Sequence, residues 1–306
     1  MRLFSVNLRH KSRNLYSFYP LPQMEISAEL HSVLVKKTIL ASNDRDIQKL
    51  TPMKFFTSLL FIFSTLLVSA DHHGKKKPLK AFMITGGCCH DYPNQKNIIS
   101  EGISERVPTK WDIFFEMDQE KSKAKLSQSG WADGYDYVVY NHCFAHEKDA
   151  AFVKSITDVH KTGKPAIALH CAMHSYHWSI PAKEGEKKAW PEMLGASSKG
   201  HGPKAAITVN KVKKHAKHPI MKDMPDGWMT PEGELYNVQE VYEGTTVLAY
   251  GDNGKNKAPK EPQACVWVNT HGKGKVFATT IGHHNSTMST KEYLDMLGNA
   301  VRWVTA

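Results

Sequence analysis

The sequence lacks the composition biases that mark fibrous, disordered or repeat proteins. Its 20 glycines and 15 prolines among 306 residues are too few for a collagen-like or low-complexity chain. Apolar residues account for 41% and charged residues for 23%, which excludes wholesale disorder. No internal repeat with a period of about 20–50 residues is visible, so solenoids and propellers are excluded too. An ordinary globular fold of one large domain or two small ones remains.

Concentrated positive charge is also missing. The chain has 40 Lys and Arg against 30 Asp and Glu, a net charge of +10, and its lysines are scattered along the sequence. A nucleic-acid interface needs basic side chains gathered on one face or one helix, so we expect no nucleic-acid partner. Histidine, by contrast, is plentiful, with 17 copies, 15 of them after Asp71.

Cysteines are few, and none of them forms a CxxC motif of the kind that binds zinc or exchanges disulfides. The number is odd, so at least one thiol is free or pairs between chains in an oxidising compartment. Cys265 lies within ACVWV and is expected to be a small buried apolar residue. The doubled Cys88-Cys89 has no function that the sequence assigns. The five are Cys88, Cys89, Cys143, Cys171 and Cys265.

The longest uncharged apolar run, residues 55–68, lies within MKFFTSLLFIFSTLLVSA. A Met and a Lys precede it, and Val68-Ser69-Ala70 place small residues before polar Asp71, which is typical of a secretory signal peptide. As a helix the run would be about 21 Å long, shorter than the ~30 Å hydrocarbon core. We therefore predict a signal peptide at 53–70, a secreted or periplasmic location and no stable membrane span after cleavage. A buried core helix and a retained membrane anchor are the alternatives.

Residues 1–52 carry little patterning upstream of this segment. We expect Met53 to be the true start and 1–52 to be a non-native or disordered extension, with a long native leader as the alternative. Residues 71–78 are interpreted as a polar linker and 79–306 as one domain. The segment 55–68 should pack against nothing in that domain.

The first half of the mature chain alternates strand and helix patterns. Apolar runs that do not alternate with polar residues indicate strands covered on both faces, as in a parallel sheet. Strand–helix–strand order favours right-handed crossovers, so residues 80–85, 135–140 and 165–169 should be adjacent inner strands. We predict an α/β three-layer sandwich with a mostly parallel central sheet. Its expected strands are 80–85, 111–117, 135–141, 164–170, 205–209, 234–241, 245–250, 264–270 and 275–280, and its expected helices are 95–106, 149–160 and 290–304.

Histidines gather where predicted strands end. The turns read GGCCHDY at 86–92, NHCFAH at 141–146, HCAMHSYH at 170–177 and IGHHNS at 281–286. Ligands of open α/β sheets bind beyond the carboxyl ends of the strands, so four such turns point to one site. A lone loop histidine is more often solvated or simply hydrogen-bonded, and that is the interpretation for most of the others.

The predicted catalytic set is His90, His170, His283 and Glu234. The three histidines follow strand ends, and Glu234 opens an apolar strand, where a carboxylate needs a partner. Imidazoles and a carboxylate held together can bring one pKa near neutrality for general acid–base catalysis. We expect the four to converge on one cleft. The accompanying substrate-binding residues are Gly86, Gly87, Asp91, Tyr92, Asn141, His142, His174, Tyr236 and His284, the glycines because they let backbone approach a ligand.

A metal is weakly indicated by two His-x3-His spacings, His170 with His174 and His142 with His146. Two histidines four residues apart suit zinc when they lie on a helix, but His170 ends a strand and no HExxH is present. We therefore assign no metal ligand and no firm cofactor, and keep zinc as an alternative.

A resemblance to a known family rests on five segments. They are similar to the ThuA-like (trehalose utilisation) family of the class I glutamine amidotransferase-like superfamily, over about residues 79–304. The resemblance implies a flavodoxin-like sandwich and a sugar substrate, a trehalose-like or keto-disaccharide. The segments are KAFMITGGCCHDYPNQ, YDYVVYNH, KPAIALHCAMHSYHW, GELYNV and GKGKVFATTIGHHNSTMSTKEYLDMLGNAVRWV.

The amidotransferase relatives place a nucleophilic cysteine where this chain has His170, which cannot form a thioester, and Cys171 points elsewhere on a strand end. Glutamine hydrolysis is therefore not expected. The leading hypothesis is an exported protein of sugar catabolism that acts on a (keto-)disaccharide or glycoside by His/Glu acid–base chemistry. A non-catalytic carbohydrate-binding module and a metal-dependent hydrolase are the alternatives.

Overall fold

A computed structural model of the chain describes residues 77–306 apart from 178, 182, 184–185 and 255–258. The predicted extension at 1–52, the signal peptide at 53–70 with its run 55–68, and residues 71–76 of the linker lie outside the described residues. Within the described part, no helix is long and apolar enough to cross a membrane.

The first half alternates strands and helices as the sequence patterns predict. Pro93 occupies the first turn of α1, where its missing N–H costs nothing. The side chains of Asp118 and Asp149 cap α2 and α3 by accepting backbone N–H groups of their first turns. The elements are β1 (Leu79–Gly87), α1 (Tyr92–Ser104), β2 (Thr109–Phe115), α2 (Gln119–Leu126), β3 (Tyr137–Cys143), α3 (Ala150–Lys161) and β4 (Ala166–Leu169).

The second half is rich in strands. It opens with the 3-10 turn η1 (His170–Met173) and closes with α6 (Lys291–Val304), which the Thr290 side chain caps. Between them lie α4 (Ala189–Leu194), β5 (Ala196–Lys204), β6 (Thr208–Lys211), η2 (Lys213–His215), η3 (Pro219–Met221), β7 (Trp228–Met229), β8 (Glu234–Val241), β9 (Thr246–Asp252), β10 (Gln263–His271), β11 (Gly274–Thr279) and α5 (Asn285–Met288).

The central sheet has the strand order β2-β1-β3-β4-β11-β10-β9-β6-β7. Strands β1, β3 and β4 are neighbours, as predicted, and with β2 and β11 they form a parallel half. Strands β10, β9, β6 and β7 add an antiparallel half, so the sheet as a whole is mixed. The α/β class is confirmed, and the last long strand of the chain, β11, lies in the middle between β4 and β10.

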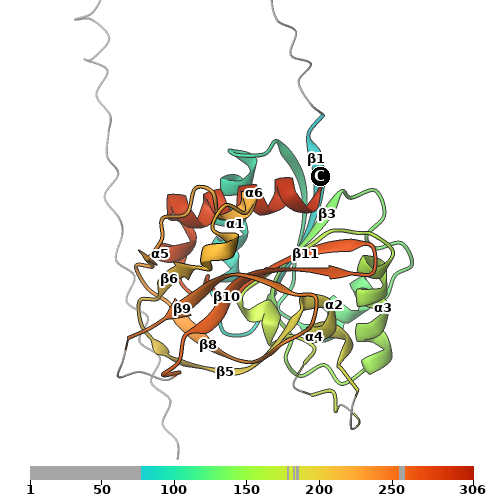
Figure 1. Ribbon diagram of the computed structural model, residues 1–306. Helices are drawn as coiled ribbons and strands as arrows, with labels where there is room; N and C mark the ends of the chain where they lie inside the picture. Colours follow the sequence, from blue (N-terminus) through green and yellow to red (C-terminus); the bar gives the residue numbers. More distant parts are fainter. Residues whose placement is uncertain (1–76, 178, 182, 184–185, 255–258) are drawn as a thin grey trace, which may run out of the picture. The chain divides into compact units, whose positions relative to one another are not determined.

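The two faces of the sheet are covered by different helices, which makes the fold a three-layer sandwich. Along β3, Tyr137 and Val139 face one core with α1 and α6, whereas Val138 and Tyr140 face a second core with α3 and α4. All four are fully buried, which explains why β3 shows an unbroken apolar run. Figure 1 shows α1 and α6 on one side of the strands and α3 and α4 on the other.

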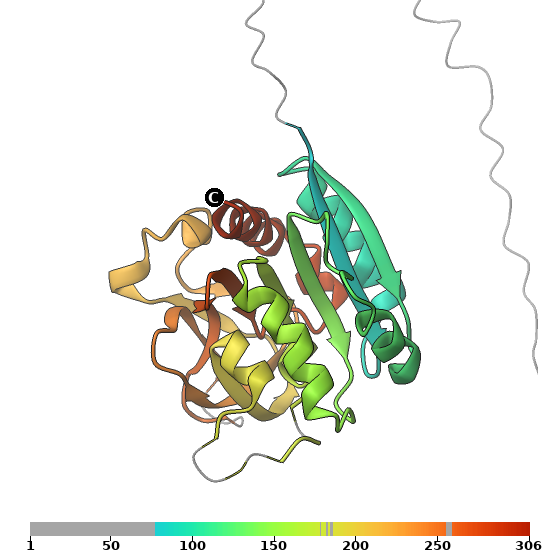
Figure 2. The same cartoon turned by 90° about the vertical axis from the view of Figure 1, so that its right-hand side faces the viewer.

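A separate two-stranded sheet, β5 paired with β8, packs on the α4 side. Figure 2 shows β1 and β2 at one end of the molecule and the orange antiparallel strands at the other. The predicted strand at 205–209 is wrong in its bounds. Residues 205–207 instead connect β5 to β6, and their backbone is held by Gly233 and Thr230.

Candidate functional site

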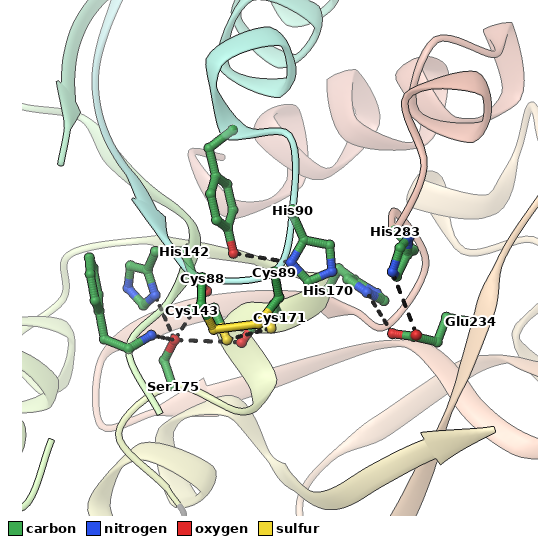
Figure 3. The surroundings of a disulfide bond; sticks show 12 residues. Cys88, Cys89, His90, His142, Cys143, His170, Cys171, Ser175, Glu234 and His283 are labelled. Atoms are coloured by element: carbon green, nitrogen blue, oxygen red, sulfur yellow. Dashed lines mark hydrogen bonds and ion pairs between the residues drawn. A yellow bond between two sulfur atoms is a disulfide. The ribbon is translucent and has the colours of Figure 1, made fainter. Parts of the chain in front are cut away.

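Three of the four predicted catalytic side chains project from turns at one edge of the sheet. His90 follows β1, His170 follows β4 directly, and His283 follows β11. These strands run in parallel, so their carboxyl ends meet at the same edge. Glu234, the first residue of β8, reaches this edge from the smaller sheet. Figure 3 shows the four side chains pointing toward one another.

The cluster is tight. One ligand atom from each of His90, His170, Glu234 and His283 lies within 4.8 Å of all the others. His170 Nε2 is 3.6 Å from one oxygen of Glu234, and His283 Nε2 is 3.5 Å from the other. The ring of His90 lies edge-on to both imidazoles. The structure therefore brings together the four residues that the sequence predicts as neighbours, and their catalytic role stays a prediction.

His170 occupies a sharp turn with a positive φ of 44°. Such backbone is uncommon outside glycine and costs free energy, and it persists only where the surroundings fix it. The side chain lies 2.5 Å by its Nδ1 from the carbonyl oxygen of Thr280. A carbonyl can only accept, so Nδ1 carries the hydrogen and Nε2 is the atom that faces Glu234.

His90 and His283 are held from behind as well. The phenol oxygen of Tyr92 lies 3.2 Å from His90 Nδ1, and burial raises the pKa of this tyrosine, which keeps it a neutral phenol. The side chain of Gln95 donates to the carbonyl of His283. Gly282 has φ of +124°, and a Cβ there would lie 2.7 Å from the Tyr293 hydroxyl, so the turn before His283 requires glycine.

Glu234 is the negatively charged side chain of the cluster at neutral pH. Burial acts to raise the pKa of Glu234, but the hydrogen bond and charge of His170, and the charges of His283 and His201, lower it below its ordinary value. Burial and the neighbouring His170 lower the pKa of His283. Glu234 is therefore ionised and His283 is a neutral imidazole.

An open cavity of about 530 Å³ borders the cluster. His90 and His283 belong to both, whereas His170 and Glu234 are only 2% and 5% exposed and lie behind this wall. The cavity has two carboxylates, from Asp91 and Glu232, within reach of a ligand. Its lining residues are Cys89, His90, Asp91, Glu232, His283, His284, Asn285 and Ser286.

A second cavity of similar volume lies between α3 and α4 and contains lysines such as Lys154, Lys161 and Lys188. It shares no residue with the histidine cluster. No group of three or more metal-ligating side chains belongs to it among the described residues.

Two of the predicted substrate-binding residues line the cavity at the sheet edge, Asp91 and His284. Asp91 accepts hydrogen bonds from Asn94 and Asn285, which lower its pKa. The carboxylate is thus ionised and already oriented.

The other predicted side chains lie behind the site. Tyr92 and Tyr236 are 1% exposed, and the ring of Tyr236 stacks on His174. The His174 ring nitrogen Nε2 lies 3.0 Å from the Ser198 hydroxyl, and burial lowers the pKa of His174 to about 3. These residues pack behind the cluster, and the direct contact of Tyr92, His174 and Tyr236 with substrate stays a prediction.

Asn141 and His142 end β3 and point to opposite faces of the sheet. The amide of Asn141 donates to Thr85 and Gln95, and His142 bonds Ser175 through Nδ1 at 2.8 Å. Both are buried and neither lines the cavity. That they bind substrate stays a prediction as well.

Gly86 and Gly87 serve the sheet itself. A Cβ on Gly86 would lie 1.8 Å from the carbonyl oxygen of Glu116, and one on Gly87 would lie 2.2 Å from that of Cys143. Both have positive φ. The space that a side chain would need is filled by neighbouring backbone, so close packing alone requires glycine at both positions. The approach of a ligand to them stays a prediction.

One functional neighbour was not predicted. His201 on β5 places Nδ1 3.2 Å from Glu234, and its side chain is 45% exposed. Its segment, ASSKGHGPK, has no apolar periodicity, so the only sequence signal was a histidine between two glycines.

The adjacent cysteines Cys88 and Cys89 form a disulfide. Figure 3 places it between His90 and the thiols of Cys143 and Cys171. Cys143, Cys171 and Cys265 are free and buried, which confirms the prediction for Cys265.

Among the described residues the His90–His170–Glu234–His283 cluster is a group able to hold a metal ion. The sulfurs of Cys88, Cys89 and Cys143 also lie close together, but the first two are paired in the disulfide. The two His-x3-His spacings of the sequence contribute no pair to either. His146 is exposed and His142 is buried at the Ser175 hydroxyl.

Comparisons with known proteins agree on the fold. A family model described as ThuA, trehalose utilisation, matches residues 82–304. The structure resembles a thua-like protein of Parabacteroides merdae, with 16% identity, a TM-score of 0.57 and coverage of 75% of this chain and 91% of that one. It also resembles a thua-like protein of Bacteroides uniformis, with 17% identity, a TM-score of 0.54 and coverage of 75% and 92%. At these identities the likeness shows the fold alone. No curated protein matches the chain.

Proposed function

Because the chain belongs to the ThuA (trehalose utilisation) family, we propose that it is an enzyme that acts on a sugar, a keto-disaccharide or glycoside, at the histidine–glutamate cluster. Family membership supports the sugar class. The cluster supports catalysis, since four ionisable side chains from four separate segments converge beside an open cavity.

One observation carries the proposal. Glu234 is buried and ionised, yet it faces histidines and no lysine or arginine ion partner is found for it among the described residues. A purely structural carboxylate gains more from a permanently charged partner. A carboxylate ringed by imidazoles instead has groups beside it that can carry a proton to and from a substrate.

The chemistry that fits is proton transfer next to a carbonyl. A keto group acidifies the neighbouring C–H bond, so a base that takes this proton and a donor that polarises the carbonyl suffice for isomerisation or elimination. Glu234 is the ionised base of the cluster, and because it lies behind His90 and His283 it receives the substrate proton through an imidazole. A second imidazole is the donor. His90 and His283 are placed to contact the sugar, since they line the cavity.

The test is a turnover screen of the purified protein with disaccharides, glycosides and their 3-keto derivatives. Glu234→Gln keeps the size of the side chain and removes the base, and should lower kcat by about 10²–10⁴-fold. Glu240→Gln is the matched control, an exposed carboxylate on the same strand. Saturable heat of binding without turnover would contradict the enzyme proposal and favour a carbohydrate-binding module.

We also propose that the protein is exported, because residues 53–70 have the layout of a signal peptide. The expected mature N-terminus is Asp71, measured by N-terminal sequencing of the exported protein. A product that begins before Asp71 would remove the cleavage proposal.

A further inference from the structure

We propose that His90, His170, His283 and Glu234 together bind one divalent metal ion of the zinc class. The inference rests on the proposed function only in that it concerns the same site. It assigns to these side chains a ligand role, which at Glu234 would take the place of the role in proton transfer.

The separations between the ligand atoms fit such an ion. Zn–N and Zn–O bonds of about 2.0–2.2 Å in tetrahedral geometry put two ligand atoms about 3.4 Å apart. His170 Nε2 and His283 Nε2 lie 3.6 and 3.5 Å from the two oxygens of Glu234. These distances lie at or beyond the long limit of a hydrogen bond, and they are within a few tenths of an ångström of the spacing expected around a shared ion.

Three buried ring nitrogens of the cluster have no hydrogen-bond partner among the described residues, His90 Nε2, His170 Nε2 and His283 Nδ1. The first two face the cluster. A buried polar atom without a partner is costly and calls for an explanation such as an ion. A cation between the rings would satisfy both lone pairs at once.

The Nδ1 atoms of His170 and His90, which point away from the cluster, have contacts like those in metal sites. Metal-bound histidines usually donate their other ring N–H to a carbonyl or a similar acceptor, which fixes the tautomer. Nδ1 of His170 does so to the Thr280 carbonyl, and Nδ1 of His90 lies against the Tyr92 hydroxyl. Each ring thus presents Nε2 to the cluster.

The donor set selects the class of ion. Three imidazoles and one carboxylate suit zinc and its transition-metal neighbours. Calcium and magnesium require mostly oxygen ligands, and only Glu234 supplies them here. The single negative charge of the carboxylate offsets part of the charge of the ion.

A bound ion would face the cavity that His90 and His283 line. There it would polarise a sugar carbonyl or lower the pKa of a bound water. Glu234 would then be a ligand, and proton transfer would fall to groups that line the cavity, Asp91, Glu232 or His284.

The experiment uses tag-free protein, stripped with a chelator and titrated with Zn²⁺ or Co²⁺. The wild-type chain should bind one equivalent by elemental analysis, and Co²⁺ should give the visible absorption of a nitrogen-ligated ion. The double variant His170→Asn/Glu234→Gln should lose this stoichiometric binding. His284→Gln, which changes the adjacent histidine outside the group, should retain it.

A second variant keeps the test independent of folding defects. Tyr92→Phe removes only the hydroxyl behind His90 and should weaken Zn²⁺ binding about 10–100-fold, the usual effect of an outer-shell partner. Wild-type protein that binds less than one equivalent, or a double variant that binds as tightly as wild type, would overturn the proposal.

The two proposals fail separately. If the protein binds one equivalent of metal and turns over no sugar, the metal site is supported and the proposed function is contradicted. Turnover that persists in chelated protein with no detectable metal keeps the function and removes the metal site as its catalyst.

Discussion

His170 Nδ1 lies 2.5 Å from the carbonyl oxygen of Thr280, a contact that ties the end of β4 to the end of the adjacent strand β11. The contact fixes the ring so that Nε2 faces Glu234. The reactive orientation of His170 is therefore set by the sheet itself rather than by a mobile loop.

Replacing His170 should separate chemistry from stability. In His170→Asn, asparagine tolerates the positive φ and its amide can still donate to Thr280. We expect kcat on a keto-disaccharide to fall by about 10²–10⁴-fold while the fold persists. Kinetics and thermal unfolding measure the two. A folded variant with unchanged kcat would make His170 a structural residue.

The stability of the fold should depend on pH through His160. This side chain is fully buried, bonded at Nε2 to the Tyr140 hydroxyl and at Nδ1 to the Lys164 carbonyl. Burial lowers its pKa from 6.5 to about 4, and nearby His271 and Lys164 add to the effect. As pH falls, His160 of the unfolded chain therefore takes up a proton near pH 6.5, whereas His160 of the native protein takes one up only near pH 4.

Because the unfolded state binds more protons in this window, the stabilisation is present above pH 6.5 and is lost as pH falls toward 4. His160 should contribute a slope of about 1.4 kcal/mol per pH unit to the free energy of unfolding. Urea denaturation of His160→Gln should show a shallower slope than wild type. The exposed His146→Gln is the control and should leave the slope unchanged. Equal slopes in all three proteins would contradict the assignment.

Alanine at Gly87 should destabilise the fold through a clash as well as strain. Its Cβ would meet the Cys143 carbonyl, whereas a Cβ at Gly134, which also has positive φ, would meet no atom within 4 Å. We expect Gly134→Ala to cost about 1–3 kcal/mol from backbone strain alone and Gly87→Ala to cost more. Denaturant unfolding measures both. A Gly87→Ala variant as stable as Gly134→Ala would contradict the clash. It would leave the predicted approach of a ligand as the reason for glycine at this position.

Thiol counting should report the disulfide. Cys88 and Cys89 are exposed and paired, and the three free thiols are buried. Native protein should react slowly with a thiol reagent, whereas brief reduction should expose two fast thiols. Denatured protein should show three thiols before reduction and five after it. Two fast thiols in unreduced native protein would mean that Cys88 and Cys89 are not paired.

The sequence predicted the strands that carry a clear apolar run. The bounds of β8 at Glu234–Val241 and the neighbours β1, β3 and β4 follow from apolar runs. Strand β5 was missed because its residues between Ala196 and Lys204 have little apolar patterning, and bulged pairing with β8 holds them in place.

The histidines of the cluster were predictable from the sequence, whereas the residues around the cluster were not. A histidine at a strand end marks the correct edge, which is why His90, His170 and His283 were found. The sequence does not say which face a residue of a doubly covered strand takes. Asn141 and His142 are adjacent, lie on opposite faces and are both buried, and no pattern distinguishes them from cavity residues.

The central place of β11 has a consequence for the order of synthesis. Strands β4 and β10 are joined only through β11, which is made after both of them. A growing chain therefore carries His90, His170 and Glu234 before it has the strand that unites the sheet and the turn that supplies His283. The four-residue cluster and the middle of the sheet are therefore complete only once β11 and the turn after it have been made.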